Sequence, residues 1–247
     1  VTASQIWVCS SGNSVAPAPL SLPVTNLDEF EAYEGMLVTF PQALVISEYF
    51  DYDRYGEIVL TSERLSQPTA TYEPGSPEAL ALVDLISRDR ITLDDGRTVW
   101  YPDPAIHPNG AVFDLGNLFR GGDTLTSVTG TVDYRYGSYR IQPTAPALYA
   151  AANPRPATPL PVEGSLRVAS FNVLNYFTTI DTGADICGPA GDQECRGADT
   201  PEEFTRQRSK IIAALAAIDA DVVALIEIEN HPGDVPVADL VDRLNAA

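Results

Sequence analysis

The stretch Asp219–Asn230, DADVVALIEIEN, decides the fold expected for the C-terminal part of this 247-residue chain. Its five consecutive apolar residues, 222–226, predict a short strand buried on both faces, as strands of parallel sheets are. Glu227 follows this apolar run directly. An ionised carboxylate at the end of a buried strand is unfavourable unless it is protonated, ion-paired or bound to a cation. The stretch therefore predicts that Glu227 holds a divalent metal, with an ion pair to Arg206 or Arg208 as the alternative.

The residues before this stretch predict a second strand and a helix that connects the two strands. Residues 166–176, LRVASFNVLNY, form a predicted strand whose apolar run gives way to the polar Asn172. The segment 200–221 opens with TPEE, a capping box with proline at the first helical position. In such an α/β layer, ligands bind near the carboxyl ends of the strands, so Asn172 and Glu227 are the predicted catalytic residues. The predicted buried face of the helix consists of Phe204, Ile211, Leu215 and Ile218.

Residues 24–145 predict a different domain, built of short strands with an inserted helix. The β-rich runs MLVTF, QALVISEYF and YGEIVLTS are separated by turn residues, and EYFDYDRYGE is the expected hairpin between the second and third. The segment 74–90 predicts a helix with Leu80, Val83 and Ile86 on its apolar face. Asp95-Gly96 predicts a hairpin within 91–100. This pattern favours a small closed or partly closed barrel.

Two further turn signals lie in the last strands of this predicted barrel. Gly130 interrupts a β-rich run and is the expected site of a bulge. Residues 136–138, Tyr-Gly-Ser, are the expected turn between two strands. The last two β-rich runs are of the type that closes the barrel of an OB fold; they are GDTLTSVTGTVDY and GSYRIQP.

The composition of the remaining segments predicts where the domains and linkers lie. Residues 1–23 predict the last strand of a preceding domain and a Ser/Pro-rich connector, and residues 146–164 predict a Pro/Ala-rich linker. The second domain is then expected over 165–247, and the fold class is mixed β and α/β. No apolar run approaches the about 20 residues that cross a bilayer, so no membrane segment is expected. No signal peptide is recognisable at the start of the chain.

Aromatic and arginine side chains are interleaved in the first predicted domain. Tyr52, Arg54, Tyr134, Arg135 and Tyr136 predict a platform on which bases of nucleic acid stack. The alternative is that strand tyrosines pack across neighbouring strands with half-exposed rings. Acidic residues flank both groups, and they would repel a polyanion.

The formal charge of −19 excludes a protein that binds nucleic acid through a broad basic surface. An enzyme that meets phosphate through a bound cation remains compatible with this charge, most of which keeps the surface soluble. Cys187 and Cys195 lie in the loop CGPAGDQEC, which predicts a local disulfide, with a zinc site as the alternative. Cys9 is left over.

Several of these segments resemble a known family. RVASFNVLNYFTTIDTG, CRGAD, FTRQRSKI and ALIEIEN resemble secreted bacterial nucleases of the DNase-I-like endonuclease/exonuclease/phosphatase superfamily. EGMLVTF, RYGEIVL and YRIQPTAP resemble the OB-fold-like domain that precedes the nuclease domain in those proteins. The resemblance implies an OB-like β-barrel over 24–145. It also implies that 165–247 is the N-terminal part of a four-layer αββα DNase-I-like sandwich.

The resemblance also implies a function. In that superfamily the first-strand Asn lies beside the scissile phosphate and the second-strand Glu binds the metal, and these positions match Asn172 and Glu227. We therefore expect an extracellular bacterial nuclease, secreted or on the cell surface, that uses Mg²⁺, Mn²⁺ or Ca²⁺ and cleaves DNA, with RNA as a further candidate substrate. Its general-base histidine and companion aspartates are expected on strands after Ala247, so this segment alone is expected to be inactive.

Two alternatives to a nuclease remain open in the sequence. One is a phosphatase of the same superfamily that acts on lipid or inositol phosphates. The other is a non-catalytic OB-type module that binds nucleic acid or a protein. Glu229 and Asn230 are expected only to fix the loop after the strand, and His231 is expected to be a loop residue.

Overall fold

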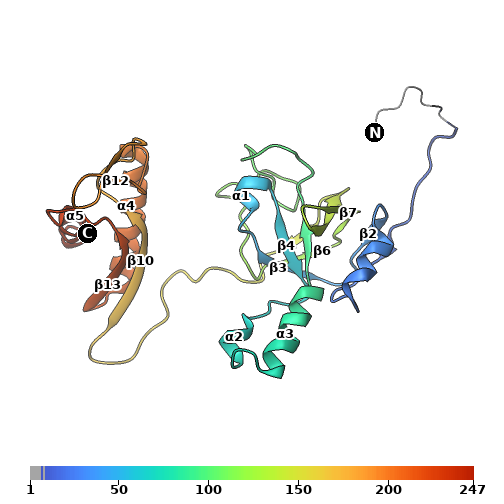
Figure 1. Ribbon diagram of the computed structural model, residues 1–247, viewed down its shortest axis with the longest axis horizontal. Helices are drawn as coiled ribbons and strands as arrows, with labels where there is room; N and C mark the ends of the chain where they lie inside the picture. The colour runs from blue at the N-terminus through green and yellow to red at the C-terminus, as the bar shows by residue number, and fades with distance from the viewer. Residues whose placement is uncertain (1–6, 8) are drawn as a thin grey trace. The chain divides into compact units, whose positions relative to one another are not determined.

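The computed structural model describes Trp7 and residues 9–247 and divides into two compact units, Val1–Arg155 and Pro156–Ala247 (Figure 1). The division falls inside the expected linker, 146–164. The strand expected near the N-terminus lies outside the described residues, except for Trp7 and Cys9, which are exposed. The fold is mixed, with one large, mostly antiparallel sheet and a few helices. No helix within the described part of the chain has the length and apolar character that a membrane span requires.

The first unit contains a nine-stranded sheet with the order β1-β2-β7-β8-β5-β4-β3-β6-β9. Its strands are β1 Ala18–Pro19, β2 Leu37–Thr39, β3 Leu44–Glu48, β4 Ile58–Thr61, β5 Ile91–Leu93, β6 Thr124–Thr126, β7 Thr129–Arg135, β8 Ser138–Pro143 and β9 Leu148–Ala150. Neighbours are antiparallel except β1–β2 and β5–β8. A closed barrel requires its end strands to pair, and no pairing among the described residues joins β1 to β9. The closed barrel is therefore not found. β1 is a short strand at the edge of the sheet, and its last residue, Pro19, has no backbone N–H that could donate a hydrogen bond.

The side chains of this sheet alternate between a core face and an outer face. Ile58 and Leu60 of β4, Ile91 and Leu93 of β5, and Ile141 of β8 are buried in one hydrophobic core. The residues between them along each strand must therefore face the other side of the sheet. These outer-face residues include Val59, Thr92, Arg140 and Gln142.

Short helices surround the sheet: a 3₁₀ helix η1 Leu27–Tyr33, α1 Tyr52–Tyr55, α2 Pro68–Thr71 and α3 Pro77–Arg88. The α3 prediction is confirmed, and Ser76 Oγ accepts the cap hydrogen bond from Ala79 N at 3.2 Å. Most of its expected apolar face is not buried, because Leu80 and Val83 are more than half exposed and Ile86 is only partly buried. Ala79 is the buried residue of α3. The expected hairpin connection between β3 and β4 contains α1, one turn of helix.

The hairpin expected within 91–100 is wrong. Asp95-Gly96 does form a turn, in which Gly96 N donates to Asp94 Oδ1 at 2.8 Å, but no strand follows it. The reason is that β5 pairs with β4 on one side and with β8 on the other, so neither edge is free for residues 97–100.

Of the two turn features predicted near β7 and β8, the bulge is not found and the turn is. Gly130 is not a bulge, since the β7–β8 register runs without a shift from Gly130–Pro143 to Arg135–Ser138. A Cβ at Gly130 would lie 2.3 Å from Gln142 O, so the close approach of two strands explains the glycine. The turn at 136–137 is confirmed, and both of its residues have positive φ, as two-residue hairpins prefer.

The start of the expected linker belongs to the first unit. Residues 148–150 form β9, which pairs with β6, and Ala147 is buried in the core. Asn153 closes the loop before β6, because its side-chain Nδ2 donates to Gly121 O at 2.7 Å and its backbone N donates to Asp123 Oδ1 at 2.9 Å.

The second unit has the expected order of strand, helix and strand. β10 Val168–Tyr176 runs parallel to β13 Val222–Ile228, and α4 Pro201–Ile218 connects them. The remaining elements are β11 Asp185–Cys187, β12 Gln193–Glu194 and α5 Val235–Asn245. The disulfide Cys187–Cys195 is confirmed, which removes the zinc alternative for this pair.

One expectation for this unit is wrong: β13 is not buried on both faces. Ile211 and Leu215 of α4 form a core with Val173 and Tyr176 of β10, and partly buried residues of β13 pack against it. On the opposite face Val222 is about half exposed, as no described element covers that side of the two strands.

Candidate functional site

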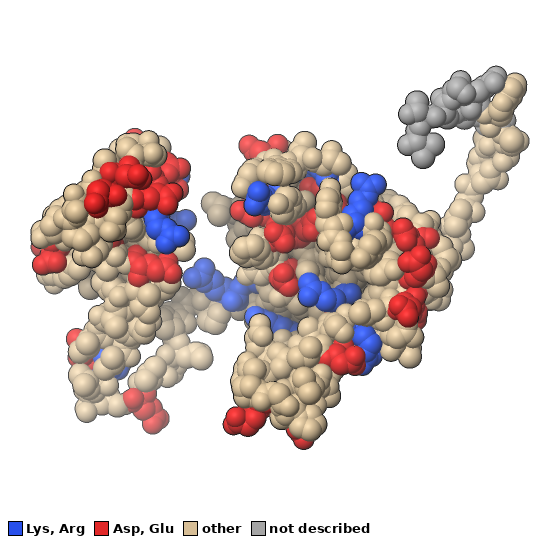
Figure 2. All heavy atoms as spheres, in the orientation of Figure 1, with Lys and Arg blue, Asp and Glu red and all other residues tan. Residues whose placement is uncertain are grey.

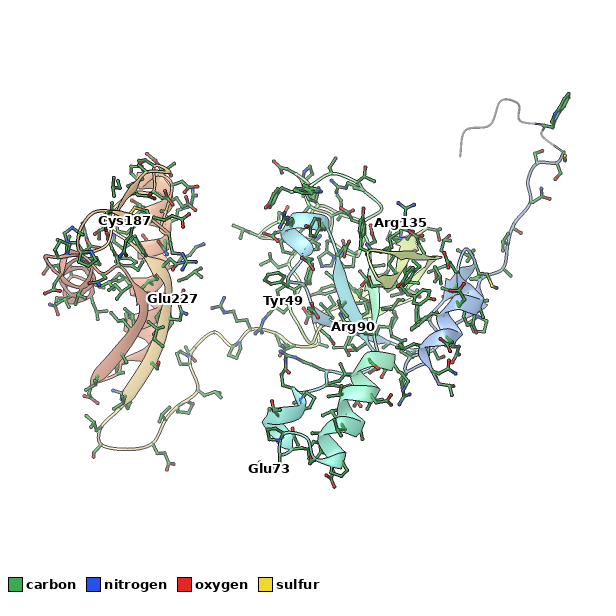
Figure 3. All side chains as sticks on the ribbon, viewed as in Figure 1. Tyr49, Glu73, Arg90, Arg135, Cys187 and Glu227 are labelled. Atoms are coloured by element: carbon green, nitrogen blue, oxygen red, sulfur yellow. A yellow bond between two sulfur atoms is a disulfide. The ribbon has the colours of Figure 1, made fainter. Side chains whose placement is uncertain are left out.

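The predicted site residues lie where the regular pairing of β10 and β13 breaks. Asn172 pairs with Ile226 and Tyr176 with Ile228, so three residues of β10, 173–175, lie opposite Glu227 alone. Because the two strands are parallel, Asn172 and Glu227 lie at the same end of the pair, where this bulge begins. Figure 3 labels Glu227 where β13 runs beside β10.

Unusual backbone conformations gather at this bulge. Leu174, Asn175 and Glu227 have φ of 52°, 53° and 63°, the left-handed region that residues with a Cβ rarely adopt. Each such residue costs on the order of 1 kcal/mol or more, and strain of this kind concentrates at functional sites. Gln207 of α4 stabilises the bulge, since its Nε2 donates to Leu174 O at 2.6 Å.

The polar groups of the two predicted residues are only partly used. Asn172 is exposed, and its Oδ1 accepts a hydrogen bond from Leu174 N at 2.8 Å. Its amide nitrogen and the exposed Glu227 carboxylate make no hydrogen bond or ion pair with any described residue. Arg208 is instead paired with Asp239, with 3.2 Å between Nη1 and Oδ1, and Arg206 is not paired with Glu227 either. The ion-pair alternative for Glu227 is therefore not found.

The chemistry of these two side chains fits a hydrated hard cation. Within the described residues no group of three or more His, Cys, Asp and Glu side chains could enclose a metal. Mg²⁺ needs no such cage, because it keeps several waters and binds one or two carboxylates together with substrate phosphate. The carboxylate of Glu227 and the amide of Asn172, at the same end of the two strands, are enough protein ligands for such a hydrated cation. A structural zinc site, by contrast, requires four protein ligands.

Glu229, two residues after Glu227, stabilises the loop that follows β10. It is 4% exposed, and its carboxylate accepts hydrogen bonds from the backbone N and Oγ1 of both Thr178 and Thr179, at 2.6 to 3.2 Å. Burial alone would raise the pKa of Glu229, but these donors outweigh it and hold the pKa below its usual value. Glu229 therefore fastens the loop after β10 to the end of β13.

Replacing Glu229 by Gln is expected to destabilise the second unit by about 1–3 kcal/mol at neutral pH, because the amide NH₂ would face N–H donors. The pKa of Glu229 is lower in the folded chain than in the unfolded chain. Its stabilisation is therefore complete above its ordinary pKa of 4.5 and is lost as the pH falls through the folded value. Urea unfolding of both proteins as a function of pH measures this, and the difference should shrink in acid. An equal difference at all pH values would contradict the assignment.

The residues of the predicted base-stacking platform have separate environments. Tyr52 is buried, its hydroxyl donates to Ile106 O at 2.9 Å, and its ring packs edge-on against Phe113 and Phe119. Burial also raises the pKa of Tyr52. Its ring is thus not available for stacking, which corrects that part of the prediction. Tyr134 is half exposed and lies 4.8 Å from the ring of its cross-strand partner, Tyr139, as the alternative expects.

The other three platform residues lie nearer the surface. The Arg54 guanidinium lies 4.9 Å from the ring centre of Trp100, a residue that the sequence did not single out because its loop was predicted to be a strand. Arg135 is ion-paired with Asp133 at 2.9 Å. Tyr136 is 90% exposed at its turn, and the Arg140 guanidinium lies 5.3 Å from its ring centre. Contact of these residues with nucleic acid stays a prediction.

Comparison with known proteins adds one family. No curated protein and no solved structure matches the chain. A family model described as a domain of unknown function, DUF8508, matches residues 10–153, which contain all nine strands of the first sheet. This match covers more than half of the chain, which therefore belongs to the DUF8508 family.

Proposed function

We propose that the second unit contributes Asn172 and Glu227 to the site of a divalent-metal phosphodiesterase that cleaves nucleic acid. The observation that carries the proposal is the parallel register of β10 and β13 at their bulge, where the Glu227 carboxylate and the Asn172 amide nitrogen lie at the same end of the two strands without a partner among the described residues. The resemblance of the surrounding segments to DNase-I-like nucleases supports the same assignment, with an OB-like first unit and a DNase-I-like second unit. The Cys187–Cys195 disulfide is consistent with the proposed extracellular location.

Each residue has a distinct role in this proposal. Glu227 would hold Mg²⁺, Mn²⁺ or Ca²⁺, and the cation, when bound, neutralises charge on the phosphoryl oxygens. Asn172 would donate from its amide nitrogen to a phosphate oxygen and orient the phosphodiester. Gln207 and Glu229 would act as positioning residues, because they hold the backbone on either side of the bulge.

The metal step can be tested on the chain itself. Glu227→Gln keeps the shape of the side chain and removes its charge, so we expect at least about tenfold weaker Mn²⁺ binding. Electron paramagnetic resonance of free Mn²⁺ measures the affinity. Glu202→Gln, an exposed acid in the first turn of α4, is the matched control and should bind like the unaltered chain. Equal binding by the Glu227 and Glu202 variants would overturn the assignment of Glu227.

The catalytic step is tested by plasmid cleavage with the protein as its gene encodes it. There Glu227→Gln is expected to lower plasmid cleavage by about 100-fold or more, with folding retained. Plasmid cleavage by the Glu227→Gln variant equal to that of the unaltered protein would contradict this role of Glu227. Hydrolysis of inositol phosphates without cleavage of DNA would favour the phosphatase alternative.

A further inference from the structure

A groove of about 700 Å³ runs over the outer face of the first unit's sheet. Its floor is formed by outer-face residues of β4, β5 and β8, namely Val59, Thr92, Arg140 and Gln142. The volume lies within the range of about 300–1,000 Å³ that is typical of small-molecule sites. Figure 3 labels Tyr49, Arg90 and Arg135, which line this groove.

Aromatic rings form the walls of the groove. Phe50, Trp100 and Tyr136 line it and are 85%, 65% and 90% exposed. The loops that carry Phe50 and Trp100 are joined, since Tyr101 N donates to Arg54 O at 2.9 Å and the Arg54 guanidinium lies over the Trp100 ring. Phe50 and Trp100 are therefore carried by joined loops and Tyr136 by the β7–β8 turn, while large parts of the three rings remain exposed.

The groove carries no excess of positive charge. Its lining includes four arginines and five acidic residues, and each arginine is ion-paired with a carboxylate. The pairs are Arg90–Glu48, Arg97–Asp95, Arg135–Asp133 and Arg140 with Glu57 and Asp94. Figure 2 shows acidic and basic side chains intermixed on the visible face of the first unit. A polyanion requires unneutralised Lys or Arg side chains, so this groove does not suit the phosphate backbone of nucleic acid.

One polar group of the floor lacks a partner. Arg140 is 2% exposed, and its Nε makes no hydrogen bond with any described residue although its two Nη atoms do. Carboxylates of Glu57 and Asp94, the amide of Gln142 and the hydroxyl of Ser138 lie in the same lining. The Gln142 amide and the Ser138 hydroxyl can donate to a ligand and the two carboxylates can accept from one, whereas Arg140 Nε is itself buried.

From this combination we propose that the groove binds a neutral saccharide chain. The apolar faces of sugar rings would lie on Trp100, Phe50 and Tyr136, and their hydroxyls would bond to the carboxylates and amide of the floor. A neutral ligand leaves the existing ion pairs in place. The proposal concerns the DUF8508 part of the chain and does not depend on phosphodiesterase activity in the second unit.

Calorimetric titration of the whole chain tests the proposal, with the β-1,4-linked hexasaccharides of glucose, N-acetylglucosamine and mannose and the α-1,4-linked hexasaccharide of glucose as probes. At least one is expected to bind with a Kd below about 1 mM. Trp100→Ala should weaken that binding about tenfold or more, and Phe50→Ala should weaken it severalfold. Tyr72→Ala removes an exposed ring outside the groove and should have no effect. Binding should also change little with salt, because no counterions are released.

Three outcomes would overturn the proposal. The first is that none of the four probes binds at about 5 mM to a chain whose circular dichroism shows it to be folded. The second is equal loss of binding in the Tyr72 and Trp100 variants. The third is oligothymidylate binding that Trp100→Ala abolishes and that salt weakens steeply, since this would make the groove a site for single-stranded nucleic acid.

Discussion

Arg140→Ala is expected to lower the unfolding free energy of the first unit by about 3–5 kcal/mol. The guanidinium is almost completely buried, and its Nη1 donates to Glu57 Oε1 at 2.6 Å and to Asp94 Oδ2 at 2.8 Å. These carboxylates hold the pKa of Arg140 above its usual value despite the opposing effect of burial. Without the guanidinium, two neighbouring and mostly buried carboxylates would be left without a counterion, which is the costly way to break a buried ion pair.

The measurement needs a signal from the first unit alone, since the two units can unfold separately. Trp7→Phe leaves Trp100 as the one tryptophan of the chain, and its fluorescence in urea then reports on the first unit. Arg135→Ala is the matched control, because Arg135 and Asp133 form a more exposed pair on the same face, and its loss should cost about 1 kcal/mol or less.

A rescue variant shows whether the loss of stability comes from the uncompensated carboxylates or from the lost packing of the Arg140 side chain. Adding Glu57→Gln and Asp94→Asn to Arg140→Ala removes both uncompensated carboxylates and should recover a large part of the lost stability. Equal stability of the single and triple variants would show that packing of the Arg140 side chain, rather than its charge, accounts for the loss. A loss no larger than that of Arg135→Ala would contradict a buried ionic cluster altogether.

The features predicted correctly from the sequence are those with local causes. The α4 helix follows from its capping box and its apolar spacing, and in the structure Thr200 Oγ1 accepts from Glu203 N at 3.1 Å. The turn at 136–137 and the Cys187–Cys195 disulfide also join residues close together in the chain. For the candidate site, the strand pattern brought Asn172 and Glu227 to the same end of the sheet, but it contained no sign of the bulge between them.

The features predicted wrongly depend on residues far apart in the chain. The Asp95-Gly96 hairpin fails because β8, almost fifty residues later, occupies the free edge of β5. Tyr52 was expected on a platform, yet the helical turn α1 directs it toward Phe113 and Phe119 of a distant loop. The buried cluster of Arg140 likewise joins β8 to the residue before β4 and the residue after β5, and each of its charged residues is an ordinary surface residue by type.

Gly130→Val is expected to destabilise the first unit by about 3 kcal/mol or more, the second large effect. A Cβ there would lie 2.3 Å from the carbonyl oxygen of Gln142 and 2.5 Å from Ile141 Cγ2. The clash is with backbone, so it cannot be relieved by turning a flexible side chain, and β7 would have to move away from β8 in the middle of the sheet. Gly121→Ala is the control, because its nearest contact would be an ordinary 3.4 Å and its stability should change by less than about 1 kcal/mol. The same urea unfolding assay with Trp100 fluorescence compares the two variants. If Gly130→Val were as stable as Gly121→Ala, the close approach of β7 and β8 and the register that depends on it would be wrong.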